Sequence, residues 1–182
     1  MAISGDYSTQ FMDGMDSEHA TIAHRIRSQS ISALVADITC FESSTSRKTA
    51  FHELICYNAP TETSHAFYPL CKVAILYDEY DGTVDLDHIF RHPVLLWIFA
   101  CFICRPSGAK GLLDGASKRP QARCVEKQYN IKHITAGAIV NCMILAIWLH
   151  SPDTQLQATG DATHINLLCA AQLGRKAAQV LE

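Results

Sequence analysis

Charged side chains are scarce in this chain of 182 residues: only 18% are Asp, Glu, Lys or Arg, whereas 48% are hydrophobic. Average soluble domains contain about 25% charged residues. A disordered chain is polar and highly charged, so this composition excludes general disorder. The length is typical of one domain and is sufficient to bury a hydrophobic core. We therefore predict one folded domain with a well-filled core, a partner-binding face or a membrane contact.

Targeting signals and long apolar runs are also missing. The amino-terminal sequence has neither the basic nor the apolar region of a secretory signal, it is too acidic for a mitochondrial transit peptide, and no N-glycosylation sequon occurs. The main apolar runs, 94–104 and 134–149, contain eleven and sixteen residues, whereas a membrane-spanning helix takes about 20. These absences predict an intracellular protein, cytoplasmic or nuclear, with two buried helices; a two-span membrane hairpin is the alternative.

Motifs of known catalytic centres are absent as well. The nucleophile elbow G-x-S-x-G and a Cys–His pair in a polar context are missing. Residues 108–118 are rich in glycine but lack the Gly-Lys-Ser/Thr order of a phosphate-binding loop. Zinc-finger spacing and the RNA-recognition signature are not found either. We therefore predict no catalytic residue and no cofactor, and the chain is more consistent with a binding protein than with an enzyme.

Eight cysteines are present, most of them among apolar neighbours. Such cysteines are typical of buried free thiols. Cys101 and Cys104 form a C-x-x-C motif, but the residues between them are Phe and Ile, and no second pair is spaced to complete a zinc site. At helical spacing the two thiols share one face of a core helix. The cysteines therefore predict neither a metal nor a redox centre.

His88 and His92 are four residues apart, as zinc ligands on a helix are, and Asp85 and Asp87 lie nearby in the sequence. However, no Glu follows His88, as the metalloprotease motif H-E-x-x-H requires. Pro93 also disfavours helical geometry at His92. We interpret this segment as an exposed acidic turn with two solvated histidines, and we predict no metal site.

Apolar spacing predicts helices over about 17–41, 47–57 and 135–150, with a polar break at 42–46 after the first of them. Pro93 is suited to open the helix that contains 94–104. Residues 70–77 are apolar almost throughout, and periodicity does not separate a buried strand from a buried helix there. We favour helix because no second strand is evident to pair with it. The prediction is a single all-α domain of five or six helices around two apolar central helices.

The predicted domain organisation has three parts. Residues 1–16 form a mobile tail, 17–166 the helical domain with its Gly-rich basic loop 105–132, and 167–182 a carboxy-terminal extension. The core is expected to form on 94–104 and 136–149. Six further side chains are expected to pack around these two helices: Phe51, Leu54, Ile55, Val73, Ile75 and Leu76.

Charge is distributed unevenly along the chain. Residues 1–90 carry 5 basic and 13 acidic residues, a net charge of 5 − 13 = −8. Residues 105–132 carry 7 basic and 2 acidic residues, a net charge of 7 − 2 = +5. The basic segment is therefore expected either to complement the acidic half of the chain or to meet an anion.

Lys118, Arg119, Arg123 and Lys127 are the candidate anion-binding residues of the basic loop. Phosphate contacts by such residues depend on charge and weaken with salt. Aromatic residues, on which bases would stack, are nearly absent, with only Tyr129 close in the sequence. We favour a solvated loop that complements the acidic half, and binding of nucleic acid or another anion is the alternative.

Four segments resemble an uncharacterised domain family of mushroom-forming fungi: Phe90–Leu96, Arg105–Ala109, Ile134–Val140 and His150–Thr154. The similarity covers about residues 50–166 and rests on helix-packing and turn residues. It implies a helical fold rather than a function, and it supplies no catalytic residue. Family members continue with aromatic-rich helices after the stretch that matches 164–166, whereas this chain continues with Leu167 and ends at Glu182, which indicates a shortened or altered copy.

The leading functional hypothesis is a non-enzymatic interaction or scaffolding module with an unidentified protein partner. It follows from the high apolar content and from the lack of a convergent catalytic set. Binding of nucleic acid or another anion through 105–132 is the first alternative. Membrane association through 94–104 and 134–149 is the second.

Overall fold

The computed structural model describes residues 21, 23–24, 26–27, 38–58, 61, 69, 72–85, 87–104, 109, 135–157 and 159–166. In chain order the elements are the 3₁₀ helix η3 (Ile38–Phe41), the α-helix α2 (Ser44–Phe51), the 3₁₀ helix η5 (Ala74–Leu76), and the α-helices α3 (Pro93–Cys104) and α6 (Ala136–His150). Within these residues there is no strand, although isolated antiparallel bridges join Tyr77 to Ile89 and Thr159 to Asn166. The mostly helical fold is confirmed, whereas the number of five or six helices stays a prediction.

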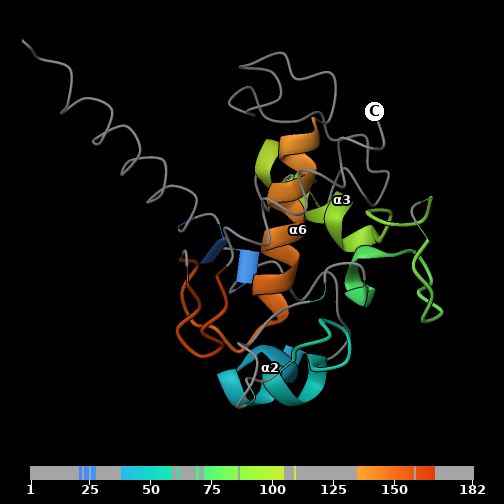
Figure 1. The fold of residues 1–182 in the computed structure, drawn as a ribbon. Helices are drawn as coiled ribbons and strands as arrows, with labels where there is room; N and C mark the ends of the chain where they lie inside the picture. The colour runs from blue at the N-terminus through green and yellow to red at the C-terminus, as the bar shows by residue number, and fades with distance from the viewer. Residues whose placement is uncertain are drawn as a thin grey trace, which may run out of the picture.

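Helices α3 and α6 form the centre of the described structure and pack against each other (Figure 1). Pro93 is the first residue of α3, as predicted. Helix α6 begins after Thr135, whose Oγ1 accepts a hydrogen bond from the Ala138 amide at 3.2 Å. It ends at His150 and is capped by Ser151, whose amide donates to the Trp148 carbonyl at 3.1 Å, and Pro152 follows directly. Both predicted central helices are therefore confirmed.

The core lies around this helix pair. Helix α6 is buried on nearly every side from Val140 to His150, with only Asn141 exposed in that stretch. A helix that is apolar all round is typical of a core position. Each large apolar side chain buried here stabilises the fold by roughly 1.5–3 kcal/mol before the entropy cost is counted. Five of the six additional core residues predicted are buried, and Leu54 is partly buried.

Helix α2 begins and ends earlier than the 47–57 predicted. Ser43 Oγ accepts a hydrogen bond from the Ser46 amide at 2.9 Å, so the helix begins inside the expected polar break. It ends at Phe51, and the following turn contains Cys56 with a positive φ of 50°. Serine side chains that compete for backbone amides are favoured at helix starts, which explains the shift.

The aromatic side chains of η3 and α2 pack on the carboxy-terminal end of α6. Phe41 and Phe51 enclose the His150 ring, with ring centroids at 5.5 Å and 4.8 Å from it. Figure 1 shows α2 beyond this end of α6. Of the helix predicted over 17–41, the structure describes only 21, 23–24, 26–27 and 38–41, and the last of these is the 3₁₀ helix η3.

Residues 70–77 do not form the favoured α-helix. Their described part is the 3₁₀ helix η5 followed by Tyr77, which pairs with Ile89 in an isolated antiparallel bridge. The Asp78 amide donates to the His88 carbonyl at 3.4 Å and continues this pairing. The partner was not evident from the sequence because the pairing involves a single residue position rather than a strand. It closes the loop 78–88, which projects from the helix pair.

Three predicted segments lie outside the described residues. They are the amino-terminal tail 1–16, the carboxy-terminal extension 167–182, and the basic loop 105–132 except for Ala109. In the described part of the chain, no helix is long and apolar enough to cross a membrane.

Candidate functional site

A small surface cavity lies between the beginning of α3 and the first half of α6, and we call it the α3–α6 groove. Its volume is about 190 Å³. The described side chains around it come from the segment before α3, from α3 and from α6: Phe90, Arg91, His92, Leu95, Leu96, Phe99, Ile139 and Cys142. Six of these eight residues are apolar, so the groove presents a largely apolar surface.

The walls of the α3–α6 groove differ in exposure. Leu95 and Cys142 are buried and form its floor, and Phe99 and Ile139 are half-buried. Leu96 is 54% exposed at the rim, although it lies in the most apolar helix of the described structure. Exposed large apolar side chains beside a cavity are typical of binding surfaces. The apolar sequence predicts a core position for this whole run and gives no signal of the exposed face.

His92 is held by the start of α3. Its Nδ1 accepts a hydrogen bond from the Val94 amide at 3.1 Å, so the imidazole caps the helix. Burial lowers the pKa of His92, and the nearby Asp78 carboxylate raises it by a smaller amount. The neutral ring then carries its proton on Nε2. His92 is half-buried rather than solvated, which corrects the expectation for this residue.

Cys142 contributes an unreactive thiol to the floor of the groove. Burial raises its pKa to about 12, and the thiolate is the nucleophilic form of cysteine. At neutral pH the side chain therefore acts as a small apolar group. Cys101 is also a buried cysteine on α3, in agreement with the predicted core position.

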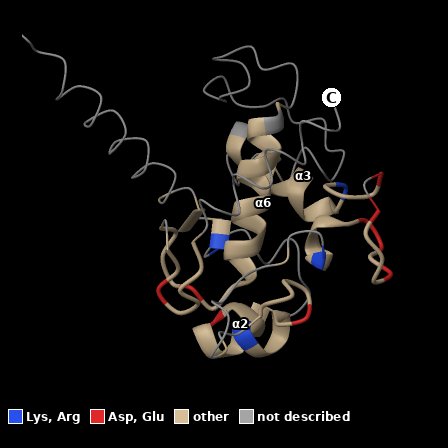
Figure 2. Ribbon diagram, in the orientation of Figure 1, with Lys and Arg blue, Asp and Glu red and all other residues tan. Residues whose placement is uncertain are grey.

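The loop 78–88 carries five acidic residues next to the groove: Asp78, Glu79, Asp81, Asp85 and Asp87. Figure 2 shows these acidic positions along the outer edge of the loop, beside the start of α3. Residues 78–92 contain one basic residue, Arg91, so the local charge is 1 − 5 = −4 with neutral histidines. The strongly acidic loop 78–88 therefore lies next to the apolar groove.

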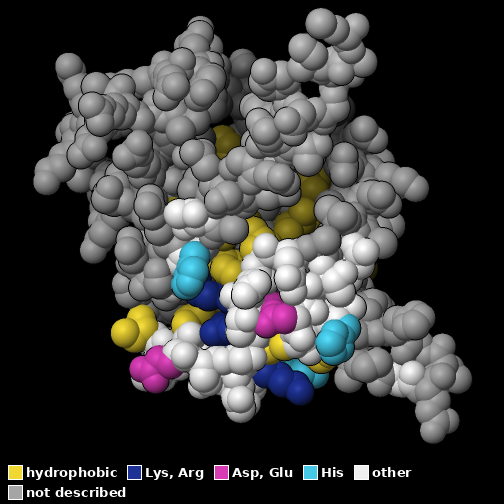
Figure 3. All heavy atoms as spheres, turned by 90° about the vertical axis from the view of Figure 1, so that its left-hand side faces the viewer, with side chains coloured by type: hydrophobic (Ala, Val, Ile, Leu, Met, Phe, Trp, Pro, Cys, Tyr) yellow, Lys and Arg dark blue, Asp and Glu magenta, His cyan; other side chains and the backbone are white. Residues whose placement is uncertain are grey.

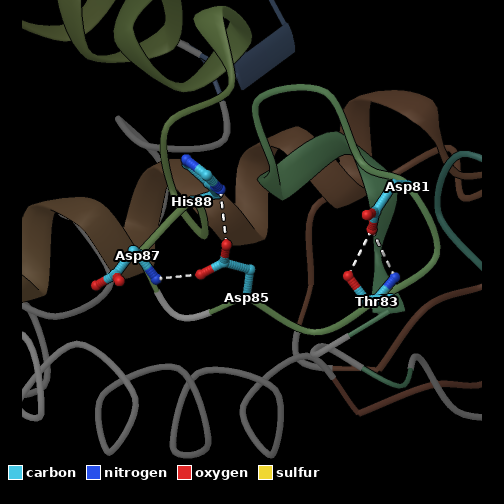
Figure 4. Close-up of polar contacts among 5 residues, drawn as sticks. All are labelled: Asp81, Thr83, Asp85, Asp87 and His88. Atoms are coloured by element: carbon cyan, nitrogen blue, oxygen red, sulfur yellow. Dashed lines mark hydrogen bonds and ion pairs between the residues drawn. The ribbon is translucent and has the colours of Figure 1, made fainter.

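Hydrogen bonds within the loop orient two of its carboxylates (Figure 4). Asp81 accepts from the Thr83 amide at 2.8 Å and from its hydroxyl at 2.6 Å, and these bonds lower the pKa of Asp81. Asp85 accepts from the Asp87 amide at 2.8 Å, which is the main cause of its lowered pKa. Both carboxylates are therefore ionised at neutral pH and contribute their full charge to the loop.

The structure separates the two histidines that are four residues apart in the sequence. His88 is exposed and its Nδ1 lies 2.8 Å from Asp85 Oδ2 (Figure 4), whereas His92 caps α3. They are not on a common helical face, because α3 begins only at Pro93. Among the residues that the structure describes, no group of three His, Cys, Asp or Glu side chains could hold a metal ion.

Two buried arginines lie at the opposite, carboxy-terminal end of α6. Arg27 donates from Nη1 to the Asp153 carbonyl at 2.6 Å and from Nη2 to the Trp148 carbonyl. Arg47 donates from Nε to the Ser151 carbonyl at 2.8 Å and from Nη1 to the Phe41 carbonyl at 3.1 Å. Cations are favoured where the last carbonyls of a helix lack amide partners. The arginines therefore hold η3, α2 and the segment after α6 together.

Asp153 organises the loop that follows α6. Its carboxylate accepts from the amides of Ala162 and Thr163 at 2.9 Å and from the Thr163 hydroxyl at 2.8 Å. Figure 3 views the molecule from the left-hand side of Figure 1. On the described surface of that face, charged side chains of both signs are interspersed with apolar ones. The region around Arg27, Arg47 and Asp153 therefore has the features of a structural site, since most of its polar groups bind backbone atoms rather than face a cavity.

The predicted anion-binding residues Lys118, Arg119, Arg123 and Lys127 lie outside the described residues. Conversely, the sequence analysis identified neither the α3–α6 groove nor the two buried arginines. The burial of Arg47 had one local signal. Arg47 lies about one turn after the Ser43 cap and one turn before Phe51, on the buried side of α2. Apart from the nearby Phe41 carbonyl, its carbonyl partners, those of Ser151, Pro152 and Asp153, lie more than 100 residues away along the chain, and no local pattern indicates them.

Comparison with known proteins gives one match. A family model described as a family of unknown function (DUF6698) matches residues 44–170, which is more than half of the chain. It covers α2, α3, α6 and the loop after α6. No curated protein and no solved structure matches significantly.

Proposed function

We propose that this chain, which belongs to the family of unknown function DUF6698, is a helical protein-interaction module. Its binding site for a partner segment is the α3–α6 groove. The observation that carries this proposal is the exposed Leu96 beside an apolar cavity on a largely buried helix pair. A single apolar anchor side chain of the partner would enter the cavity, and the rest of its segment would lie along the rim.

The size of the groove supports a side chain rather than a cofactor as its occupant. Its volume of about 190 Å³ is below the roughly 300–1,000 Å³ of pockets that enclose small-molecule ligands. Anchoring by one or two buried apolar or aromatic side chains is typical of protein interfaces. An amphipathic helix laid into an apolar groove is a common form of such binding.

The polar groups of the groove support binding rather than catalysis. The Nδ1 atom of His92 is used in capping α3, and the thiol of Cys142 is protonated at neutral pH. A catalytic base or nucleophile has to be within hydrogen-bond reach of its substrate with a pKa matched to its task. The Nδ1 lone pair of His92 is occupied by the Val94 amide, and the Cys142 thiol is not in its nucleophilic form.

Fluorescence anisotropy with labelled amphipathic helical peptides tests the proposal. We expect the full chain to bind a peptide with Leu and Phe on one face, and we expect Leu96→Ser to weaken that binding. Ile38→Ser is the matched control, because Ile38 is 50% exposed and lies on η3, outside the groove lining. Equal affinities of both variants and the unmodified chain, or no binding of any apolar peptide, would contradict the proposal.

A further inference from the structure

The acidic loop 78–88 borders the groove because of how the chain is closed. Tyr77 and Ile89 form the bridge at the base of the loop, and Phe90 and His92 of the groove lining follow within three residues. The carboxylate of Asp78 is near enough to influence the pKa of His92 in the groove wall. The acidic side chains and the apolar cavity are therefore parts of one continuous surface.

This loop has no described cation that balances its charge apart from Arg91 and His88. Asp78, Glu79 and Asp87 are exposed, and among the residues that the structure describes the ion pair of this loop joins Asp85 to His88. Tyr80 adds a half-buried aromatic ring between Glu79 and Asp81, tilted by 38° against the Tyr77 ring with ring centroids 4.8 Å apart. Carboxylates beside an aromatic face are suited to binding Lys and Arg side chains.

From this charge complementarity we propose that the partner segment is a cationic amphipathic peptide, with an apolar side chain in the α3–α6 groove and Lys or Arg side chains along the loop 78–88. This inference rests on the proposed function and specifies the chemistry of the partner. The apolar contact supplies most of the affinity, since exposed ion pairs contribute little individually. The acidic loop selects among apolar segments and accelerates their association.

Three synthetic peptides test the charge preference by fluorescence anisotropy with the full chain. They share the same Leu and Phe positions, and their polar positions are all Lys, all Gln or all Glu. We expect the Lys peptide to bind most tightly and the Glu peptide most weakly. The difference is expected to decrease as salt is raised from 50 to 500 mM, because salt screens exposed charges.

Neutralising variants locate the effect on the loop. Asp78→Asn with Asp87→Asn removes two charges whose carboxylates make no hydrogen bond that holds the loop, unlike those of Asp81 and Asp85. We expect affinity for the Lys peptide to fall on the order of three- to tenfold, with little change for the Gln peptide. Glu42→Gln with Glu53→Gln is the control, because it changes the net charge equally at exposed positions just after η3 and just after α2.

The outcomes separate this inference from the proposed function. If all three peptides bind equally and Leu96→Ser weakens each, the groove binds apolar segments but the cationic preference is wrong. If no peptide binds, both are wrong.

Tighter binding of the Lys peptide after joint neutralisation of Lys118, Arg119, Arg123 and Lys127 would assign the groove to the chain's own basic segment. Concentration-dependent dimerisation that Leu96→Ser abolishes would assign it to a second copy. Either result would overturn the assignment to a separate partner.

Discussion

The guanidinium of Arg27 lies over the indole ring of Trp148, 3.6 Å from the ring centroid, while its Nη2 donates to the carbonyl of the same residue. Burial lowers the pKa of Arg27 to about 9, and the like charge of Arg47 contributes. The side chain therefore stays charged at neutral pH. Contact with an aromatic face and with helix-terminal carbonyls compensates part of the cost of burying that charge.

Arg47→Met is expected to destabilise the protein. The substitution keeps a long apolar stem but leaves the buried carbonyls of Phe41 and Ser151 without this donor. Leaving buried polar groups unsatisfied costs about 1–3 kcal/mol. Chemical denaturation should show the loss, and Lys48→Met on the exposed side of the same helix is the control. Equal stability of the two variants would mean that the guanidinium contacts contribute nothing.

Gly160→Ala is expected to destabilise the loop after α6. A Cβ at this position would lie closer than 3.0 Å to the carboxylate of Asp153 and the hydroxyl of Thr163. These groups are hydrogen-bonded to each other and cannot move without losing that contact. Gly137→Ala is the matched control, since its Cβ would meet only the Thr135 hydroxyl oxygen at 3.9 Å. Thermal melting that ranks Gly137→Ala as the less stable variant would contradict this.

Thr135→Ala is expected to weaken the beginning of α6. The substitution removes the hydroxyl that accepts from the Ala138 amide, and loss of such a cap costs about 1 kcal/mol. Thr135→Ser retains the hydroxyl and should stay close to the parent stability. Hydrogen exchange would show faster exchange of the first amides of α6 in the alanine variant alone. A uniform change along the helix in both variants would rule out a capping effect.

Acidification is expected to destabilise the fold through His150. Burial lowers the pKa of this imidazole to about 4 from an ordinary value of 6.5. Between these values the unfolded chain binds more protons than the folded one, so stability decreases as pH falls from about 6.5 to about 4. His150→Phe, which keeps an aromatic ring between Phe41 and Phe51, should show a shallower decrease. Denaturation midpoints at several pH values would measure it, and parallel curves would exclude His150 as the cause.

The basic loop supplies a prediction that comes from the sequence alone. If 105–132 binds phosphate groups, joint substitution of Arg119, Arg123 and Lys127 by Ala should abolish a salt-dependent affinity for a short duplex DNA. Nitrocellulose filter binding at 50 mM salt would measure it. The Glu42→Gln and Glu53→Gln variant is a control with unchanged basic residues. No affinity of the parent chain at low salt would end this hypothesis.

Helix α6 shows which parts of the fold could be predicted from the sequence. Its long apolar stretch, the capping Thr135 and the terminating Pro152 are all local signals, and each is read within one or two helical turns. The same holds for Pro93 at the start of α3. The length of α2 was predicted less well, because Ser43 was interpreted as part of a break rather than as a cap.

The candidate site was not predicted, because it depends on contacts between distant segments. Leu96 and Ile98 belong to the same apolar run, yet Leu96 is exposed and Ile98 is fully buried. The difference comes from which side of α3 meets α6. Likewise, His92 was expected to be solvated, but the start of α3 supplies the Val94 amide that it accepts from.

Local signals in the sequence are sufficient to predict the two central helices and the apolar core, because caps, prolines and apolar runs act over a few residues. The packing of distant segments places an acidic loop beside an apolar groove and brings Arg47 to carbonyls beyond α6. Such arrangements depend on how helices pack and where the chain returns. Their free energy comes from burying groups that are far apart in the sequence.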